Sequence, residues 1–406
     1  MWGKKSPDCG EKCWQPALGS SIMERTMTKQ AFCKTFHHVA PGREERQEVI
    51  DSTLGTFIGN DMAKQQLSRA VYGALGKWDH CCADQFALLG RKSVGKTTLA
   101  KLFVKALGLP FVEINAQVIT KLDDMAEEIR KACAQSGYPL QVVGADGIPP
   151  WVPIANLYQE HGVEAVNPHN EDFSWWGVGP RPDTIIPPVV VFIDEVHLLR
   201  SRLQQALLKA TEPHDRRLQT EHMLLDCRYV CWLIATTDRG KLFDAFDSRF
   251  TKVNMTGYAF EERIKILQMH HPELGLNPCR AIAMVGGRVP RELLTFAKAV
   301  KEDMAMTGDT WDFSVPRIAL ERGRDPGGFT TRQIDVLTAL GEKPVARGTL
   351  AGYVSCKEEE LVNVVMLDLF EDRLVTTCSR GYAITKAGLK VLDERQVRHS
   401  GEAALV

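Results

Sequence analysis

The chain has 406 residues, a charged fraction of 25%, an apolar fraction of 44% and a formal net charge of −1 at pH 7. These values are those of a globular protein with room for two or three domains. No apolar stretch is long enough to cross a bilayer and no secretory signal follows the first residues, so we expect a cytoplasmic protein. The near-zero charge requires any nucleic-acid binding to come from a local basic patch or a ring channel. The scattered cysteines form no disulfide framework and indicate reduced thiols.

The first functional motif occupies residues 90–97, which read G-x-x-x-x-G-K-T. An apolar run at 86–89 precedes it and a helical pattern at 99–107 follows, so strand, glycine loop and helix occur in the order of a phosphate-binding loop. Backbone N–H groups and the helix N-terminus can hold phosphates, Lys96 can reach the β- and γ-phosphates, and Thr97 can ligate Mg²⁺. The candidate nucleotide-binding residues of this motif are Gly90, Val94, Gly95, Lys96, Thr97 and Thr98.

A second apolar run, at 189–193, ends in Asp194 and Glu195. Its β-branched residues predict a buried parallel strand, and ligands of open α/β sheets bind at the carboxyl ends of such strands. Asp194 would hold Mg²⁺ through water, and Glu195 would polarise the attacking water. The alternative is a strand that ends by chance in an acidic turn, which the preceding glycine loop disfavours.

Three further polar positions follow in the order that an ATP site requires. The strand predicted at 229–235 ends before Thr237, whose hydroxyl could contact the γ-phosphate, although Thr-Thr-Asp is also turn chemistry. Arg249 lies between a serine and a phenylalanine, and Arg291 follows Pro290 at the start of a helix. Taken alone, either arginine could be a solvated surface charge.

The order of these motifs resembles that of the AAA+ ATPases and, more closely, of the RuvB family, the motors that drive branch migration of Holliday junctions. The resemblance runs from about residue 50 to about residue 395, and its matching segments lie at 56–60, 95–100, 192–199, 235–237 and 289–291. It implies an α/β fold in which a P-loop AAA+ parallel sheet is flanked by helices and followed by a helical lid and a C-terminal winged helix-turn-helix domain.

The resemblance also implies roles for individual residues. Ile58 and Tyr258 would lie near the adenine, Thr237 would be sensor 1, and Arg291 would be sensor 2 on the lid. Arg249 would be the arginine finger, acting on ATP held by a neighbouring subunit. The implied catalytic residues are Lys96, Asp194, Glu195, Thr237, Arg249 and Arg291, with ATP and Mg²⁺ as cofactors. The family forms hexameric rings, for which a closing heterologous interface is the physical route.

One polar residue has two interpretations. Asn115 ends the strand predicted at 110–114 and could be a switch that turns Glu195 off, or an ordinary turn residue.

We expect four segments along the chain. They are an N-terminal extension at 1–45, a large ATPase domain at 46–256 with an insertion at 136–188, a lid at 257–325 and a C-terminal domain at 326–406. In the last segment, three helical patterns and an alternating stretch at 375–385 predict a winged helix.

Charge decides how this last segment could touch DNA. Its third helix, expected at 358–374, carries the acids Glu358, Glu359, Glu360, Asp368, Glu371 and Asp372 and would repel a phosphate backbone. The candidate DNA contacts are Arg380 at the wing tip with Lys386 and Lys390 behind it. A winged helix that docks a protein is the alternative.

Two additions stand outside the family pattern. The insertion holds Trp151, Tyr158, Phe173, Trp175 and Trp176, which could stack on bases, grip a partner or form a local cluster. The extension holds Cys9, Cys13, Cys33 and His37 in loosely zinc-compatible spacing, or is an ordinary reduced extension. The family's long hairpin that docks the partner RuvA is replaced at 211–227 by a shorter polar segment, so docking to a RuvA-like partner is in doubt.

The interpretation that unites these observations is an ATP-dependent DNA motor of the RuvB type. It would hydrolyse ATP in a ring, driving branch migration of four-way junctions in recombination and repair. The alternatives are a clamp-loader-like or initiator-like AAA+ remodeller acting on DNA, and a nucleotide-gated DNA or protein adaptor with little turnover.

Overall fold

The computed structural model describes residues 41–77, 84–135, 141–142, 184–186, 188–212, 216–221 and 224–402. The cysteine and histidine residues of the N-terminal extension and the five aromatic residues of the insertion lie outside these ranges.

The central element is a sheet of five parallel strands in the order β2-β5-β8-β1-β9. The strands are β1 (Phe86–Leu89), β2 (Phe111–Asn115), β5 (Val189–Asp194), β8 (Val230–Thr236) and β9 (Thr251–Asn254). The strands β1 and β8 are buried along their whole length because helices cover both faces of the sheet, which is why their sequences are apolar without alternation. The strand β8 lies between β1 and β5, so the residue after β8 lies between the glycine loop and the acids.

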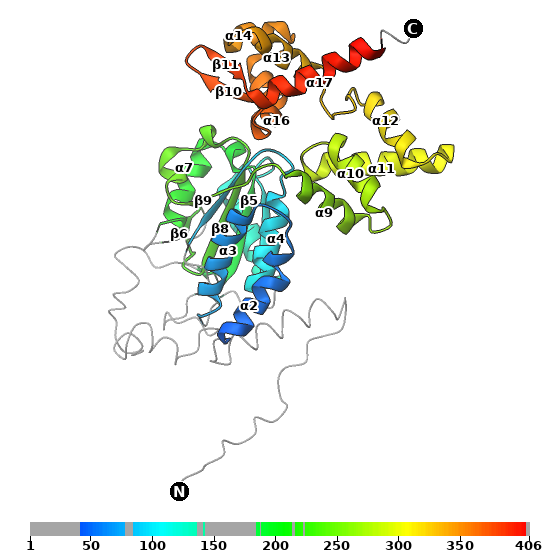
Figure 1. The fold of residues 1–406 in the computed structure, drawn as a ribbon. Helices are drawn as coiled ribbons and strands as arrows, with labels where there is room; N and C mark the ends of the chain where they lie inside the picture. Colours follow the sequence, from blue (N-terminus) through cyan, green and yellow to red (C-terminus); the bar gives the residue numbers. More distant parts are fainter. Residues whose placement is uncertain are drawn as a thin grey trace, which may run out of the picture.

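Helices on the two faces of the sheet build two separate cores. Alternate residues of β1 point to opposite faces: Phe86 and Leu88 pack in one core, and Ala87 and Leu89 in the other. The first face is covered by α2 (Arg43–Ser52), α3 (Asp61–Ala74) and α4 (Lys96–Leu107), with a 3-10 turn at Leu54–Thr56. The second is covered by α5 (Leu122–Gln135), α7 (Ser201–Ala210) and α8 (Asp244–Asp247). In Figure 1, α4 and α7 lie on opposite sides of the strands.

A small second sheet joins the ends of the insertion to the chain that follows α7. Its strands are β3 (Gln141–Val142), β4 (Thr184–Ile185), β7 (Leu224–Asp226) and β6 (Arg217–Gln219), in that order. The pairs β3-β4 and β6-β7 are antiparallel, and β4-β7 is parallel. The segment expected to be shorter and polar therefore still forms a short hairpin, β6-β7.

The helices that follow β9 form a group beside the sheet, on the side of α4 (Figure 1). They are α9 (Phe260–His270), α10 (Leu276–Val285), α11 (Pro290–Thr307) and α12 (Trp311–Glu321). Their apolar side chains belong to the same core as α3 and α4. Pro290 is the first residue of α11 and Gly308, in the left-handed conformation with φ of 77°, ends it, which are the residue types favoured at those positions.

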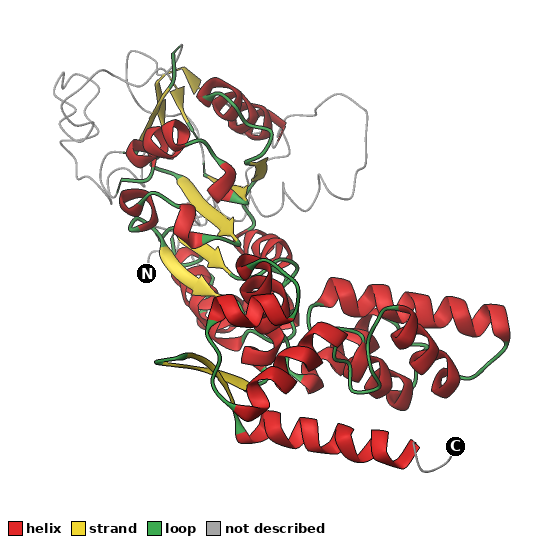
Figure 2. Cartoon of the chain, turned by 90° about the horizontal axis from the view of Figure 1, so that it is seen from above, coloured by secondary structure: helices red, strands yellow, loops and turns green. Residues whose placement is uncertain are grey.

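The C-terminal module, residues 329–394, has a core of its own. It contains α13 (Thr331–Glu342), α14 (Arg347–Tyr353), α15 (Glu358–Glu360), a π turn (Leu361–Val365), α16 (Met366–Glu371), the hairpin β10 (Val375–Cys378) with β11 (Gly381–Ile384), and the start of α17 (Lys386–Glu402). This order fits the expected winged helix, with the third helix interrupted by the π turn. The helix α17 projects away from the central sheet (Figure 2).

Across the described ranges, no helix is both long and apolar enough to cross a membrane.

Candidate nucleotide-binding site

The glycine loop runs from the end of β1 to the start of α4, and steric limits explain its glycines. A Cβ atom on Gly90 would lie 2.5 Å from the Met255 carbonyl oxygen. A Cβ atom on Gly95 would lie 3.0 Å from both the Phe57 ring and the Tyr258 hydroxyl, and the φ of Gly95 is +92°. Only glycine meets both conditions without strain. The two glycines therefore let the loop pack closely against Met255, Phe57 and Tyr258.

Lys96 is the first residue of α4 and is only 6% exposed. Its Nζ donates hydrogen bonds to the carbonyl oxygens of Gly90, at 2.9 Å, and Arg91, at 3.1 Å. Burial lowers the pKa of Lys96, and the nearby carboxylates of Glu195 and Asp194 oppose that shift. A buried ammonium held only by carbonyl oxygens and nearby acids is well placed to bind the phosphates of a nucleotide.

Two hard oxygen ligands meet beside the loop, although they come from different elements. The hydroxyl Oγ1 of Thr97, in α4, donates to Oδ2 of Asp194, at the end of β5, over 3.1 Å. The other oxygen, Oδ1, accepts from the Glu195 backbone N–H at 2.9 Å. Hydroxyl and carboxylate oxygens are ligands that Mg²⁺ accepts beside phosphate and water. The residues present therefore fit the expected magnesium ion.

Glu195 is hydrogen-bonded to Thr237, the residue after β8, which is the strand between Glu195 and the glycine loop. Its Oε2 accepts from Thr237 Oγ1 at 3.0 Å and from the Thr237 N–H at 3.3 Å. The backbone of Glu195 has a φ of +50°, in the left-handed region that costs a non-glycine residue energy. Such strain is found most often at functional sites.

His197 is a neighbour of Glu195 to which sequence reasoning assigned no role. It lies in the 3-10 turn Val196–Leu198, with Nδ1 3.3 Å from Glu195 Oε2 and 2.9 Å from Thr236 Oγ1. Its side chain is 9% exposed. The sequence did hold a signal for this contact, because His197 follows Glu195 by only two residues in the segment 192–199. Asn115, in contrast, accepts from the Gln117 N–H at 2.9 Å, as a turn residue does.

Arg249 lies far from its own glycine loop. Thr251, two residues later, pairs with Phe86 at the amino end of β1, whereas the loop leaves the carboxyl end. The length of β1 separates the two by about 13 Å, at about 3.3 Å per residue. The guanidinium is half-buried, and its Nη2 is 3.7 Å from Glu212 Oε1.

Of the remaining predicted residues, two are buried or partly buried and the others are exposed. Tyr258 donates to the Val94 carbonyl at 2.9 Å beneath the loop, and burial raises its pKa to about 12. Ile58 packs, partly buried, against the same core. Arg291 is exposed on α11 and forms no ion pair with any side chain that the structure describes. The other exposed residues are Thr98 on α4, Arg380 after β10, and Lys386 and Lys390 on α17.

Comparison with known proteins finds similarity in the part of the chain that holds the glycine loop and over a longer span. The family described as "ATPase family associated with various cellular activities (AAA)" matches residues 86–144, which begin at β1 and include the glycine loop. The Holliday junction branch migration complex subunit RuvB of Mycoplasmopsis pulmonis is 22% identical over 222 residues, covering 50% of this chain and 70% of that protein.

Solved structures resemble the chain over a longer span. The Thermotoga maritima RuvB Holliday junction branch migration motor matches with a TM-score of 0.56 at 20% identity, covering 85% of this chain and 98% of that one. A point mutant of the same protein matches with a TM-score of 0.57, covering 84% and 97%. The predicted α/β fold with an AAA+ parallel sheet is confirmed.

Proposed function

We infer that this chain, an AAA+ ATPase with the fold of RuvB, hydrolyses ATP in a ring of its own copies and uses the energy to drive branch migration of four-way DNA junctions. One observation carries the inference. Lys96, Thr97, Asp194, Glu195 and Thr237 converge at one edge of the sheet, while Arg249 lies at the opposite end of β1. A site so divided becomes complete when a second copy brings its arginine to the first.

The residues at the carboxyl edge would bind and orient the nucleotide. The loop N–H groups and the Lys96 ammonium would hold the phosphates, exchanging the carbonyl contacts of Lys96 for phosphate oxygens. Thr97 and Asp194 would hold Mg²⁺, which neutralises negative charge on the β- and γ-phosphates when it is bound. These residues position the γ-phosphate for attack by water.

Glu195 would accept a proton from the attacking water. Its carboxylate is joined to Thr237 and His197, which restrict its orientation at the point where the γ-phosphate would lie. Arg249 of a neighbouring copy would stabilise the charge of the transition state, a contribution of about 10³ to 10⁵ in rate in enzymes with arginine fingers. Hydrolysis would thereby depend on the interface between copies.

DNA contact would come from the C-terminal module, through Arg380 at the turn of the β10-β11 hairpin and Lys386 and Lys390 on α17. All three side chains are exposed, and Lys390 is 3.9 Å from Glu394 on the same helix. Such contacts neutralise phosphates without reading bases. Binding should therefore weaken steeply with salt.

The test measures ATP hydrolysis with and without four-way junction DNA, together with the size of the assembly in the presence of ATP. We expect ring formation and stimulation by the junction. Branch migration of a labelled junction separates the motor from a clamp-loader-like remodeller, which would hydrolyse ATP without moving the junction. Nucleotide binding with negligible turnover would instead identify an adaptor and contradict the proposal.

A further inference from the structure

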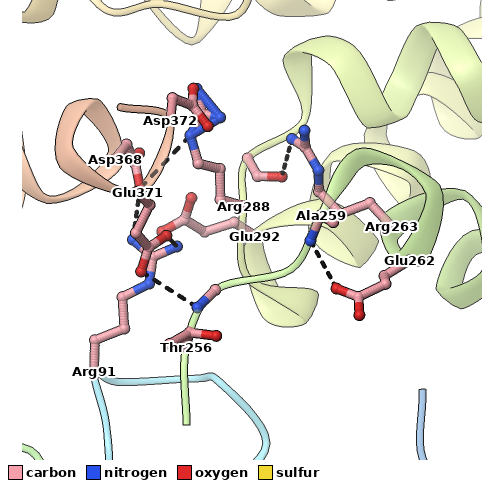
Figure 3. A network of polar contacts seen from close by, with 12 residues as sticks. Arg91, Thr256, Ala259, Glu262, Arg263, Arg288, Glu292, Asp368, Glu371 and Asp372 are labelled. Atoms are coloured by element: carbon pink, nitrogen blue, oxygen red, sulfur yellow. Dashed lines mark hydrogen bonds and ion pairs between the residues drawn. The ribbon is translucent and has the colours of Figure 1, made fainter. Parts of the chain in front are cut away.

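Acidic side chains on and just after α16 contact arginines beside the proposed nucleotide site. Asp368, Glu371 and Asp372, here called the α16 carboxylates, contact Arg91 of the glycine loop and Arg288, which precedes α11 (Figure 3). Arg91 and Asp368 are 277 residues apart in the chain. These acids were expected only to repel DNA.

On the side of the loop, Arg91 forms ion pairs with two carboxylates. Its Nη1 is 2.5 Å from Asp368 Oδ1 and its Nη2 is 3.2 Å from Glu371 Oε2. The second oxygen of Glu371 accepts from the Gly257 N–H at 3.3 Å. The side chains of Arg91 and Asp368 are 18% and 19% exposed, so the contact is largely closed to water. The carbonyl of the same Arg91 accepts from Lys96, which ties this contact to the phosphate-binding lysine.

On the side of the lid, Arg288 contacts Asp372 and lies 3.9 Å from Asp368 Oδ1. The Arg288 carbonyl accepts from the Tyr258 N–H at 3.3 Å, below the glycine loop. Nearby Arg263, 8% exposed, donates through Nη1 to the Gly287 carbonyl at 3.3 Å, and its buried Nε has no hydrogen-bond partner. The helix α16 therefore bridges the loop and the lid, and basic groups on both sides face its acids.

Two opposing effects act on the charges of Glu371 and Asp372: attraction by the arginines and loss of water on burial. Burial raises the pKa of Glu371 and of Asp372, although Arg91 and Arg288 act in the opposite direction. Burial and the like charge of Asp368 therefore act against the attraction of the arginines at both acids. A contact balanced in this way responds to a modest change of charge nearby.

A bound nucleotide makes such a change. Its phosphates carry several negative charges and would lie in the loop that holds Arg91, next to the α16 carboxylates. Like charges at short range in a partly buried site repel each other. The phosphates would also compete with the carboxylates for Arg91.

We propose that docking of α16 and binding of the nucleotide oppose each other: the α16 carboxylates act as an intramolecular anion on Arg91 and Arg288, and the bound nucleotide displaces them and frees the C-terminal module. Linkage makes the effect reciprocal, because docking must lower nucleotide affinity by the same factor. The inference rests on the proposed nucleotide binding of this site and is independent of motor activity on DNA.

Two variants undock α16 by different means. Asp368→Ala combined with Glu371→Ala removes the side chains that contact Arg91, so that its guanidinium loses both partners. Gly257→Ala changes no charge, but its Cβ would lie 2.2 Å from Glu371 Oε2 and 2.9 Å from Arg91 Nη2, so the Glu371 carboxylate must move away from Arg91. Glu359→Ala, at an exposed position, and Gly352→Ala, which has no atom within 4 Å of the new Cβ, are the matched controls.

The measurement is the Kd of the full chain for the magnesium complex of adenylyl imidodiphosphate, by calorimetry, with thermal melting to verify folding. We expect both undocking variants to bind about 5- to 10-fold more tightly than the natural chain, at the lower end of typical allosteric couplings, and the controls to bind like it. If both undocking variants bind with unchanged or weaker affinity, the proposal is wrong. If the natural chain binds no nucleotide at all, the proposed function fails as well, so the two failures are distinguishable.

Hydrogen exchange supplies a readout that does not depend on affinity. The Gly257 N–H is covered by Glu371, so its exchange should accelerate when the analogue binds to the natural chain, as should that of α16 peptides. Gly257→Ala should show fast exchange of α16 without nucleotide. Slower exchange of α16 on nucleotide binding would overturn the proposal by showing that docking and binding are cooperative.

Discussion

Thr237 Oγ1 donates a hydrogen bond to Glu195 Oε2 over 3.0 Å, and this contact joins the acid after β5 to the hydroxyl after β8. Because β8 lies between β1 and β5, the contact lies beside the place where the phosphates would end. If Glu195 has the proposed catalytic role, it would sense the γ-phosphate through the neutral Thr237 hydroxyl. The contact leads to the first prediction.

Replacing Thr237 by valine removes the hydroxyl and keeps the shape of the side chain. We expect ATP hydrolysis to fall by about 10- to 100-fold, because a hydrogen bond to a charged group is worth about 1.5–3 kcal/mol. The Kd for a non-hydrolysable analogue should change little. Thr237→Ser, which keeps the hydroxyl, is the control and should retain most of the rate. Equal loss in both variants would show that the methyl group, and not the hydroxyl, matters.

His197 should be a positioning residue for Glu195. His197→Ala leaves Glu195 Oε2 without its neighbour at 3.3 Å, and we expect kcat to fall by about tenfold, the loss of one modest hydrogen bond, while KM stays constant. His197→Asn places an amide nitrogen near the position of Nδ1 and should recover most of kcat. A histidine that only fills space would give a loss of stability in both variants and no separation of kcat from KM.

Gly95→Ala tests the steric requirement of the glycine loop. The new Cβ would meet Phe57 and Tyr258 at 3.0 Å on a backbone with a φ of +92°, so we expect a loss of about 1–3 kcal/mol in the free energy of unfolding, measured in urea. Gly73→Ala, in α3 with open space around the new Cβ, should not destabilise the chain. Equal stabilities would mean that the loop relaxes freely.

The docking of α16 should depend on pH with a defined sign. Glu371 and Asp372 have pKa values raised by burial from ordinary values of 4.5 and 3.8, so the docked state binds protons more readily than the released state. The proton-linked part of the docking free energy is therefore fully present below the ordinary values and is lost as pH rises through the raised ones. The groups that face these acids are Arg91, Arg288, Arg263 and, on the same helix, Asp368.

The measurement compares two chains, because the nucleotide itself titrates. The ratio of the analogue's Kd in the natural chain to that in Gly257→Ala should grow as pH falls from 7.5 toward 5, since only the natural chain gains docking. A ratio that shrinks over this range would contradict the sign.

Local patterns in the sequence predicted the residues at the carboxyl edge of the sheet, because each belongs to a motif that ends or follows an apolar strand. Lys96 and Thr97 come from the glycine loop motif after β1 and Asp194 ends β5, and the contact between Thr97 and Asp194 agrees with this prediction. The position of β8 between β1 and β5 is a property of the whole sheet, which no periodicity encodes.

The contacts of α16 were beyond sequence reasoning for a different reason. The acids of this helix are visible in the sequence, but the pairing of Asp368 with Arg91 joins two parts of the fold that pack only in three dimensions. The π turn before α16 and the hairpin β6-β7 are likewise set by packing. Acidic residues were therefore interpreted by their sign alone, as repelling DNA, and not by the arginines they contact.

Mixing two inactive variants tests the shared site most directly. Lys96→Ala removes nucleotide binding but keeps Arg249, whereas Arg249→Ala keeps nucleotide binding but lacks the arginine. In a mixed ring, an Arg249→Ala copy that holds ATP beside a Lys96→Ala copy has a complete site. We expect each variant alone to show almost no junction-stimulated hydrolysis and the mixture to recover a substantial part of it. A mixture that stays inactive while forming rings, or Arg249→Ala hydrolysing ATP at the natural rate alone, would contradict a site completed by the neighbouring copy.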